Sequence, residues 1–204
     1  LRGDVSSSNQ AIGSTGGHQV YGTYLHNQSL VNTTSGAINI YGTSTARSIF
    51  GGAIWIGTGT YASGEGNVSN ASSVANGYST AIVSDSGPVL IDARMTNART
   101  DGWAHALIFL SRVNDRQLIK TNTGSITLKG YADSAKADST GVVFQMENTI
   151  SGMDVVSTSG DIYLQGQQAQ RSTASTNNAI RMGPSASASS MRFGALTDNA
   201  STYT

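Results

Sequence analysis

A segment that occurs four times along the chain sets the strongest limit on what it can fold into. Each copy has a glycine preceded by Ser or Thr, a β-branched aliphatic residue five positions earlier, and aliphatic residues two and four positions later. The glycines are Gly36, Gly87, Gly124 and Gly160, and they are separated by 51, 37 and 36 residues. Self-similarity of this kind indicates stacked structural units.

The aliphatic positions have the spacing of β-strands. Residues two apart on a strand point to the same face, so each pair after a glycine is expected to face a core while the residue between them faces outward. The expected inward pairs are Ile38 and Ile40, Val89 and Ile91, Ile126 and Leu128, and Ile162 and Leu164. The aliphatic residues before the glycines are Val31, Ile82, Ile119 and Val155.

The Ser-Gly or Thr-Gly step between these strands has the chemistry of a tight turn. The hydroxyl can bond the local backbone, and glycine tolerates a positive φ. Each unit is therefore predicted to be strand, tight turn, strand. A third strand is expected before each unit, around Val20, Ile54, Ile108 and Phe144. By the same pattern, Gly3 is expected to open an earlier copy and Gly194 a late one.

Three short strands per unit predict an all-β fold, a right-handed single-stranded parallel β-helix of about five coils. The units span roughly 36 residues, and the longest contains a loop insertion over residues 57–80. Residues 1–204 are expected to form one β-helix segment, a fragment of a longer fibre, because so short a stack exposes strand edges. Asp92 and Lys129 are expected at one outward position on consecutive coils, close enough for a weak ion pair. The alternative is a β-sandwich of antiparallel hairpins.

The composition excludes several classes of protein. Twelve Lys and Arg balance twelve Asp and Glu, so the chain has no basic field for nucleic acid, and no nucleic-acid partner is expected. There is no cysteine for a disulfide or a thiolate zinc site. No apolar run approaches the roughly 20 residues of a membrane-spanning helix, so no direct membrane insertion is expected. The chain starts at Leu1 without a signal-type stretch and is interpreted as a mature segment or an excised fragment.

The stretch Ser159-Gly-Asp-Ile-Tyr-Leu-Gln-Gly166, with related stretches ending at Gly130 and Gly42, resembles the repeats of filamentous haemagglutinin-type exoproteins and related large bacterial adhesins. These proteins are exported by two-partner secretion or as autotransporters. The resemblance implies a secreted or cell-surface β-helical shaft that carries adhesive regions of a virulence factor away from the bacterium. The lack of cysteine suits such export. The implied partners are host-surface glycans or proteins, together with flanking parts of the same chain.

Two places in the sequence are candidates for binding. Arg2-Gly3-Asp4 resembles the integrin-binding tripeptide and could present a guanidinium and a carboxylate from a turn, although its glycine also fits the repeat. Tyr61 and Tyr78 lie in the insertion, and loops on a rigid scaffold often carry function. Their rings could stack on sugars or on a partner surface.

The residues for catalysis are sparse. His18, His26 and His105 are expected to be solvated or capping side chains rather than a metal site. The aspartates are spread among turns and loops with no adjacent pair, and only two glutamates are present. No catalytic residue, metal or cofactor is therefore expected. Trp55, between Ile54 and Ile56, is predicted to face outward.

Two functions remain open from the sequence. The first is a non-enzymatic structural or adhesive segment of a secreted or cell-surface bacterial adhesin, whose coils hold many weak contacts at fixed spacing. The alternative is a polysaccharide-binding or polysaccharide-degrading β-helix domain, as in a phage tail fibre or a lyase. A degrading enzyme would need at least two carboxylates within about 10 Å of each other on adjacent coils.

Overall fold

The computed structural model describes residues 1–5, 19–25, 29–45, 50–57, 77–97, 103–111, 115–134, 138–146, 151–170, 178–184 and 190–194. These residues form strands in three parallel five-stranded sheets. The chain contributes one strand to each sheet in turn, and we call each set of three strands a coil. The predicted parallel β-helix with three strands per coil is confirmed.

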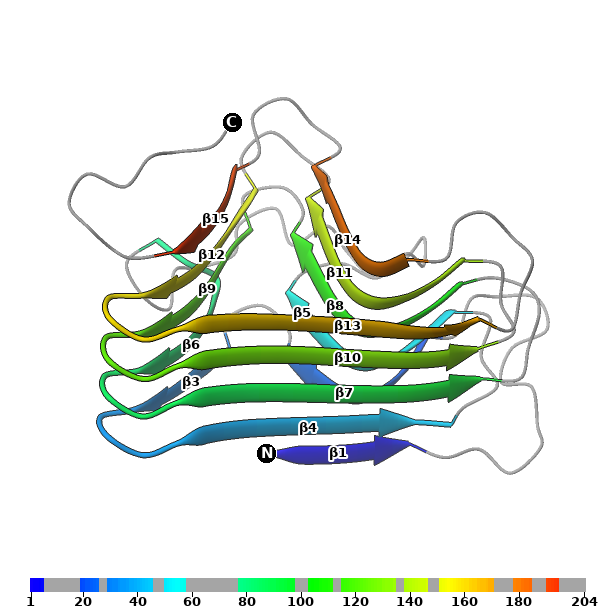
Figure 1. Cartoon of the computed structure of the whole chain (residues 1–204), viewed down its shortest axis with the longest axis horizontal. Helices are drawn as coiled ribbons and strands as arrows, with labels where there is room; N and C mark the ends of the chain where they lie inside the picture. Colours follow the sequence, from blue (N-terminus) through cyan, green and yellow to red (C-terminus); the bar gives the residue numbers. More distant parts are fainter. Residues whose placement is uncertain are drawn as a thin grey trace.

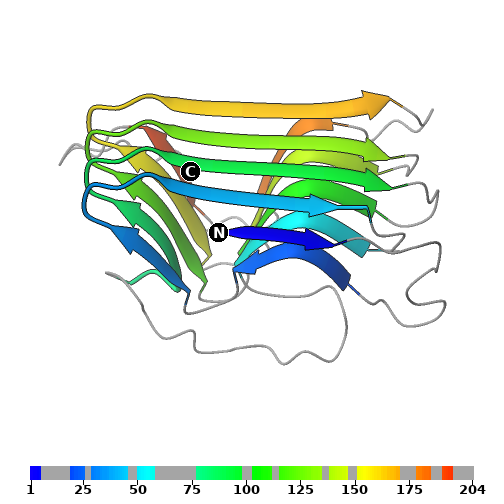
Figure 2. The same cartoon turned by 90° about the horizontal axis from the view of Figure 1, so that it is seen from below.

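The five coils are numbered along the chain, and their strands stack in sequence order (Figure 1). The first sheet contains β1 (Arg2–Val5), β4 (Ile38–Ser44), β7 (Val89–Asn97), β10 (Ile126–Ser134) and β13 (Ile162–Gln170). The second contains β2 (Gln19–Leu25), β5 (Phe50–Gly57), β8 (Trp103–Ser111), β11 (Asp138–Met146) and β14 (Asn178–Pro184). The third contains β3 (Leu30–Thr33), β6 (Thr80–Ser84), β9 (Arg116–Thr121), β12 (Gly152–Ser157) and β15 (Ser190–Gly194). Figure 2 shows the first sheet along one side, with the other two sheets facing its inner surface.

The register confirms the repeat that the sequence predicts. Ile38 pairs with Val89, Val89 with Ile126, and Ile126 with Ile162. The column on the third sheet runs through Val31, Ile82, Ile119 and Val155. These columns supply much of one core cluster between the three sheets. In the last coil Ile162 and Leu164 are only partly buried, because β13 is the edge strand of the first sheet among the described residues.

A line of hydroxyl groups connects the turns between the third and first sheets. The Oγ of Ser84 accepts a hydrogen bond from the N–H of Gly87 at 2.9 Å and donates one to the carbonyl of Gly36 at 3.3 Å. Thr121 repeats both bonds, with Gly124 at 3.0 Å and Gly87 at 3.2 Å. Ser157 repeats them again, with Gly160 and Gly124. Each hydroxyl therefore closes its own turn and also joins that turn to the preceding coil.

The turn glycines are required for a different reason than the one predicted. Among the described residues, the glycines with positive φ are Gly57, Gly77 and Gly194, so the expected positive φ at the turn glycines is wrong. Instead, a Cβ atom at Gly87 would come within 3.0 Å of the carbonyl of Gly36. The same approach recurs on the next two coils. Stacking of turn on turn therefore excludes a side chain.

The first and second sheets approach each other too closely for side chains along one line. A Cβ at Gly130 would come within 3.0 Å of the Gly141 carbonyl, and a Cβ at Gly141 would meet the Gly130 carbonyl in the same way. Gly166 has the same relationship to Ala179 on β14. The recurrence of small residues along this line reflects contact between two backbones rather than a turn.

Three details of the predicted repeat are wrong. Gly3 pairs with Gly42 inside the first sheet. It therefore aligns with the position six residues after the turn glycine and not with the turn glycine itself. Gly194 pairs with Val156, at the end of β12 and ahead of the turn. Val20 pairs with Gly51, so counting back from the turn glycine misplaces it relative to Ile54. The connections between strands differ in length, and counting across them loses the register.

The extra residues of the long unit belong to the connection from a strand of the second sheet to the next strand, in the third sheet. β5 ends at Gly57 and β6 begins at Thr80, and residues 58–76 lie outside the described part of the chain. Trp55, as predicted, points away from the main core that holds Ile54 and Ile56. It is fully buried there in a separate cluster with Tyr21 and Ile108. Within the described ranges, no helix is long and apolar enough to cross a membrane.

Candidate functional site

The outer face of the first sheet carries polar side chains in rows that cross the strands. The parallel register places Arg2, Tyr41, Asp92, Lys129 and Gln165 in one row, with one residue from each strand. A second row, two positions further along each strand, contains Thr43, Arg94, Tyr131 and Gln167, and Asp4 has the corresponding register position on β1. Because strand residues alternate between faces, both rows point away from the core.

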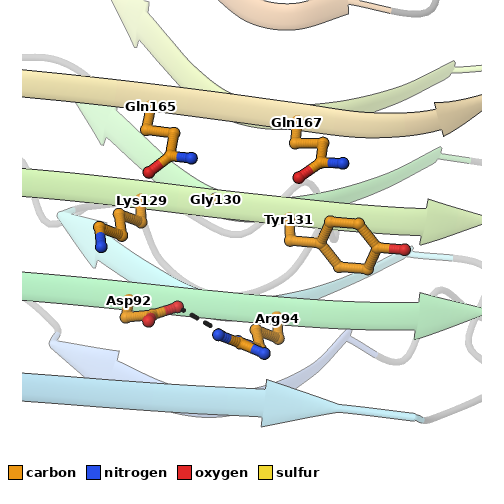
Figure 3. Close-up of a pocket in the computed structure, with 7 residues that line it drawn as sticks. All are labelled: Asp92, Arg94, Lys129, Gly130, Tyr131, Gln165 and Gln167. Atoms are coloured by element: carbon orange, nitrogen blue, oxygen red, sulfur yellow. Dashed lines mark ion pairs between the residues drawn. The ribbon is translucent and has the colours of Figure 1, made fainter.

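These two rows line two neighbouring shallow hollows. One hollow of about 320 Å³ lies over β7, β10 and β13 (Figure 3). A second hollow of about 340 Å³ lies over β1, β4 and β7. Both are lined by Asp92 and Arg94, so they are adjacent, and we call the surface that the two hollows form the groove. The side chains that line the groove are Arg2, Tyr41, Thr43, Asp92, Arg94, Lys129, Tyr131, Gln165 and Gln167.

The charges of the groove are mostly positive. Asp92 and Lys129 occupy the same position on consecutive strands, as predicted. The ion pair of Asp92, however, is with Arg94 on its own strand, at 3.5 Å, and not the predicted one with Lys129. The Arg94 side chain is 70% exposed whereas that of Asp92 is 19% exposed. The described lining residues thus include three cations, Arg2, Arg94 and Lys129, and one carboxylate, Asp92, while Asp4 holds a register position in the second row.

The described groove residues offer hydrogen-bond donors, hydrogen-bond acceptors and aromatic ring faces to a bound molecule. Lysine and arginine donate hydrogen bonds to anions, the amides of Gln165 and Gln167 donate and accept, and the tyrosines offer ring faces and hydroxyls. Glycoside hydrolysis uses two carboxyl groups on opposite sides of the bond. Asp92 is the single carboxylate among the described residues that line the groove, and Arg94 is bound to it.

The Arg2-Gly3-Asp4 tripeptide lies in β1, which pairs in parallel with β4. It is therefore extended and does not form the turn that was expected. Arg2 contributes to the groove beside Tyr41, and Asp4 takes the register position opposite Thr43. Tyr61 lies outside the described residues.

Tyr78 is described, and it is buried. Its side chain is 9% exposed, and its hydroxyl donates a short hydrogen bond to a carboxylate oxygen of Asp154. Arg116 and Arg192 bind the same carboxylate oxygen at 3.4 and 2.9 Å, and the Arg116 guanidinium lies 4.8 Å from the centre of the Tyr78 ring. In this arrangement the ring packs inside a cluster on the third sheet and is not presented to a sugar.

Burial is the main cause of a raised pKa at Tyr78. The hydrogen bond to Asp154 and the negative charge of that carboxylate raise the pKa further, while the charges of Arg116 and Arg192 lower it. The neutral phenol is thus the form that fits the cluster. Tyr78 remains a hydrogen-bond donor that fixes the segment before β6 against β12.

A second buried carboxylate fixes the same segment. Asp115 is fully buried and accepts a short hydrogen bond from Ser79 Oγ and another, at 3.3 Å, from the Gln117 amide. The backbone N–H of Ser79 donates to the carbonyl of Arg116 at 2.8 Å. Tyr78 and Ser79 are therefore attached to the third sheet by two carboxylates, which serve structure rather than an open site.

His18 and His26 lie outside the described residues. His105 is 3% exposed, and its Nε2 lies 3.4 Å from the Arg181 guanidinium. The expected solvated position is therefore wrong for His105. In the part of the chain that the structure describes, no three His, Asp or Glu side chains are placed to hold a metal ion.

Most groove residues were missed by reasoning from the sequence. The repeat identified the outward positions of Asp92 and Lys129, and the same alignment would have added Tyr41 and Gln165. The second row was missed because its residues follow the aligned motif. The tripeptide pattern does not indicate that Arg2 lies in this row, because that placement depends on the pairing of Gly3 with Gly42. Comparisons with protein-family models, with curated proteins and with solved structures give no match for this chain.

Proposed function

We propose that this chain is a non-enzymatic structural and adhesive segment of a secreted or cell-surface bacterial protein. Its coils form a stiff scaffold, and the groove makes weak, repeated contacts with a surface partner. The observation that carries the proposal is the groove itself, a polar, tyrosine-bearing face that crosses all five strands of one sheet.

The scaffold supports this role through its hydrogen bonding. Each interior strand pairs on both sides in parallel, so the coils form one continuous stack. The turn hydroxyls add bonds between successive coils at one corner. A stack of this kind holds side chains on neighbouring coils about 4.8 Å apart, which favours many small contacts over one deep site.

Export to the cell surface is part of the proposal, and its support comes from the sequence. The repeat resembles those of exported bacterial adhesins, and the chain contains no cysteine that could form a disulfide before export. The partners proposed on this basis are host-surface glycans or proteins.

The test is binding to surfaces. Beads coated with the purified chain should be retained on epithelial cells and on an array of cell-surface glycans, in excess of beads coated with an unrelated β-helix. A variant in which Arg94 and Lys129 are both replaced by Gln should be retained less. Retention equal to that of the control beads on every surface would overturn the adhesive role. Release of new reducing ends from any polysaccharide would overturn the non-enzymatic one.

A further inference from the structure

We infer that the groove binds an extended acidic polysaccharide, one with carboxylates on its sugar rings, which lies across the strands of the first sheet along the axis of the stack. The inference rests on the proposed adhesive function and names the partner of that same face. It is carried by the charges, the polar groups and the length of the groove.

The cations of the groove are distributed along its length. Arg2 is on β1, Arg94 on β7 and Lys129 on β10, so a positive group occurs in both hollows and where they join. A ligand with one carboxylate would use one of them. A polymer with a carboxylate on successive sugars can use all three, and its weak contacts add.

The other lining groups suit sugars. Gln165 and Gln167 extend the groove over β13, where Figure 3 shows both amides pointing toward β10. Amides bind hydroxyl groups both as donors and as acceptors. Tyr131 on β10 and Tyr41 on β4 place aromatic rings beside the cations, and such rings pack on the apolar faces of sugars while their hydroxyls stay in water.

The direction of the ligand follows from the rows. The groove crosses five strands, and four intervals of about 4.8 Å give it a length of roughly 19 Å. A lining position recurs at each interval across the strands, whereas along one strand at most two polar side chains line the groove. A linear polymer therefore meets more contacts when it lies across the strands than along one of them.

Asp92 distinguishes between possible anionic polymers. It lies at the centre of the groove and lines both hollows. A nucleic acid, with a phosphate at every nucleotide, would bring dense negative charge against this carboxylate, and the chain as a whole has no net positive charge to offset it. A polysaccharide can place a hydroxyl there as a donor and its carboxylates at the flanking cations.

The probe for the test is an oligogalacturonate long enough to span the groove, with its fully methyl-esterified form as the neutral match. Binding is measured by titration calorimetry with the intact chain at low ionic strength. The acid form should bind at least about tenfold more tightly than the ester, and added salt should reduce the difference. Galacturonate monomer should bind far more weakly than the oligomer.

Charge variants with opposite expected signs test the location. Lys129→Gln removes a cation and should weaken binding of the acid form by up to about fivefold, whereas Asp92→Asn should strengthen it by a similar factor. Lys120→Gln on β9 removes the same charge from another sheet and should leave affinity unchanged. Circular dichroism and the Tm of each variant verify that it is folded.

The outcomes separate the inference from the function on which it rests. Equal affinity for acid and ester, or tighter binding of a single-stranded oligonucleotide of matched length, would overturn the inference while the chain could still adhere to cells. Weaker binding by Asp92→Asn, or an equal loss in Lys120→Gln, would overturn the location. Failure of the chain to bind any probe or any cell surface would overturn both proposals.

Discussion

The carbonyl oxygen of Gly36 lies in the space that a side chain on Gly87 would need. Successive turns at this corner are thus stacked backbone on backbone. A substitution at Gly87 has to displace the preceding turn or its own, and neither can move without disturbing the hydrogen bonds that join the two turns.

We therefore expect Gly87→Ala to lower the free energy of unfolding by about 2–3 kcal/mol or more, as overpacking of a rigid site does. Urea unfolding followed by circular dichroism measures the change. The matched control is Gly36→Ala, because among the described residues a Cβ there meets only the Thr33 hydroxyl, at 3.2 Å. Its loss should be within about 1 kcal/mol. Equal losses in the two variants would contradict stacking as the reason for glycine.

The hydroxyl of Thr121 should contribute measurably to the free energy of unfolding. Thr121→Val keeps the shape of the side chain but removes the acceptor for the Gly124 N–H and the donor to the Gly87 carbonyl. A loss of about 1–3 kcal/mol in unfolding free energy is expected, because a buried backbone group is left unsatisfied.

The control for that hydroxyl is Ser86→Ala. Ser86 is exposed, and its hydroxyl makes a longer bond to Thr34, at 3.4 Å. Its removal should change the free energy of unfolding by no more than about 0.5 kcal/mol. If Thr121→Val were as mild as Ser86→Ala, the line of hydroxyls would not contribute to stability.

The core columns predict a difference between interior and terminal coils. Leu128 is fully buried between β7 and β13, so Leu128→Ala should cost about 2–5 kcal/mol of unfolding free energy. Leu164 is the equivalent residue of the last coil and is only partly buried, so Leu164→Ala should cost clearly less. The same urea series measures both, and a reversed order would refute the inward assignment of Leu128.

Tyr78 should give the protein a sensitivity to alkali. Its pKa in the folded state is raised above the ordinary value of 10.0, chiefly by burial. The folded state therefore prefers the protonated phenol, and the stability that this supplies is complete below pH 10 and is lost as the pH rises through the higher folded pKa.

In Tyr78→Phe the part of this pH dependence that comes from Tyr78 should disappear. The Tm measured from pH 9 upward should fall less steeply in the variant than in the unmodified chain. Tyr163→Phe is the control, because the pKa of Tyr163 is also raised, by its bond to Asp161, but the ring is 55% exposed. An unchanged alkaline profile in Tyr78→Phe would show that its hydroxyl does not couple to folding.

The fold was predictable because its information is local and repeated. The two-residue spacing of Ile126 and Leu128 and the recurrence of the motif were enough to place inward columns in register. The stacking of Gly87 on Gly36 could not be predicted from the sequence. A glycine required for a positive φ and a glycine required because a neighbouring backbone leaves no room for a side chain look the same in a sequence.

The site was less predictable because its partners are distant in sequence. Tyr78 follows the part of the long unit where the sequence departs from the repeat, and nothing in the neighbouring sequence indicates that its hydroxyl would bond to Asp154, 76 residues away. The groove joins side chains from five separate strands, so a single error in alignment, as at Gly3, removes a strand from it. Register is the information that sequence patterns preserve least well across connections of unequal length.

The turn hydroxyls also give the stack a direction of growth. Ser84 donates to the first coil's turn at Gly36, Thr121 to the turn at Gly87, and Ser157 to the turn at Gly124, always toward the N-terminus. A coil thus finds the acceptor for its hydroxyl already in place when the chain before it has folded. Each completed turn is a template for the next, and a chain that emerges N-terminus first can assemble in the order in which it appears.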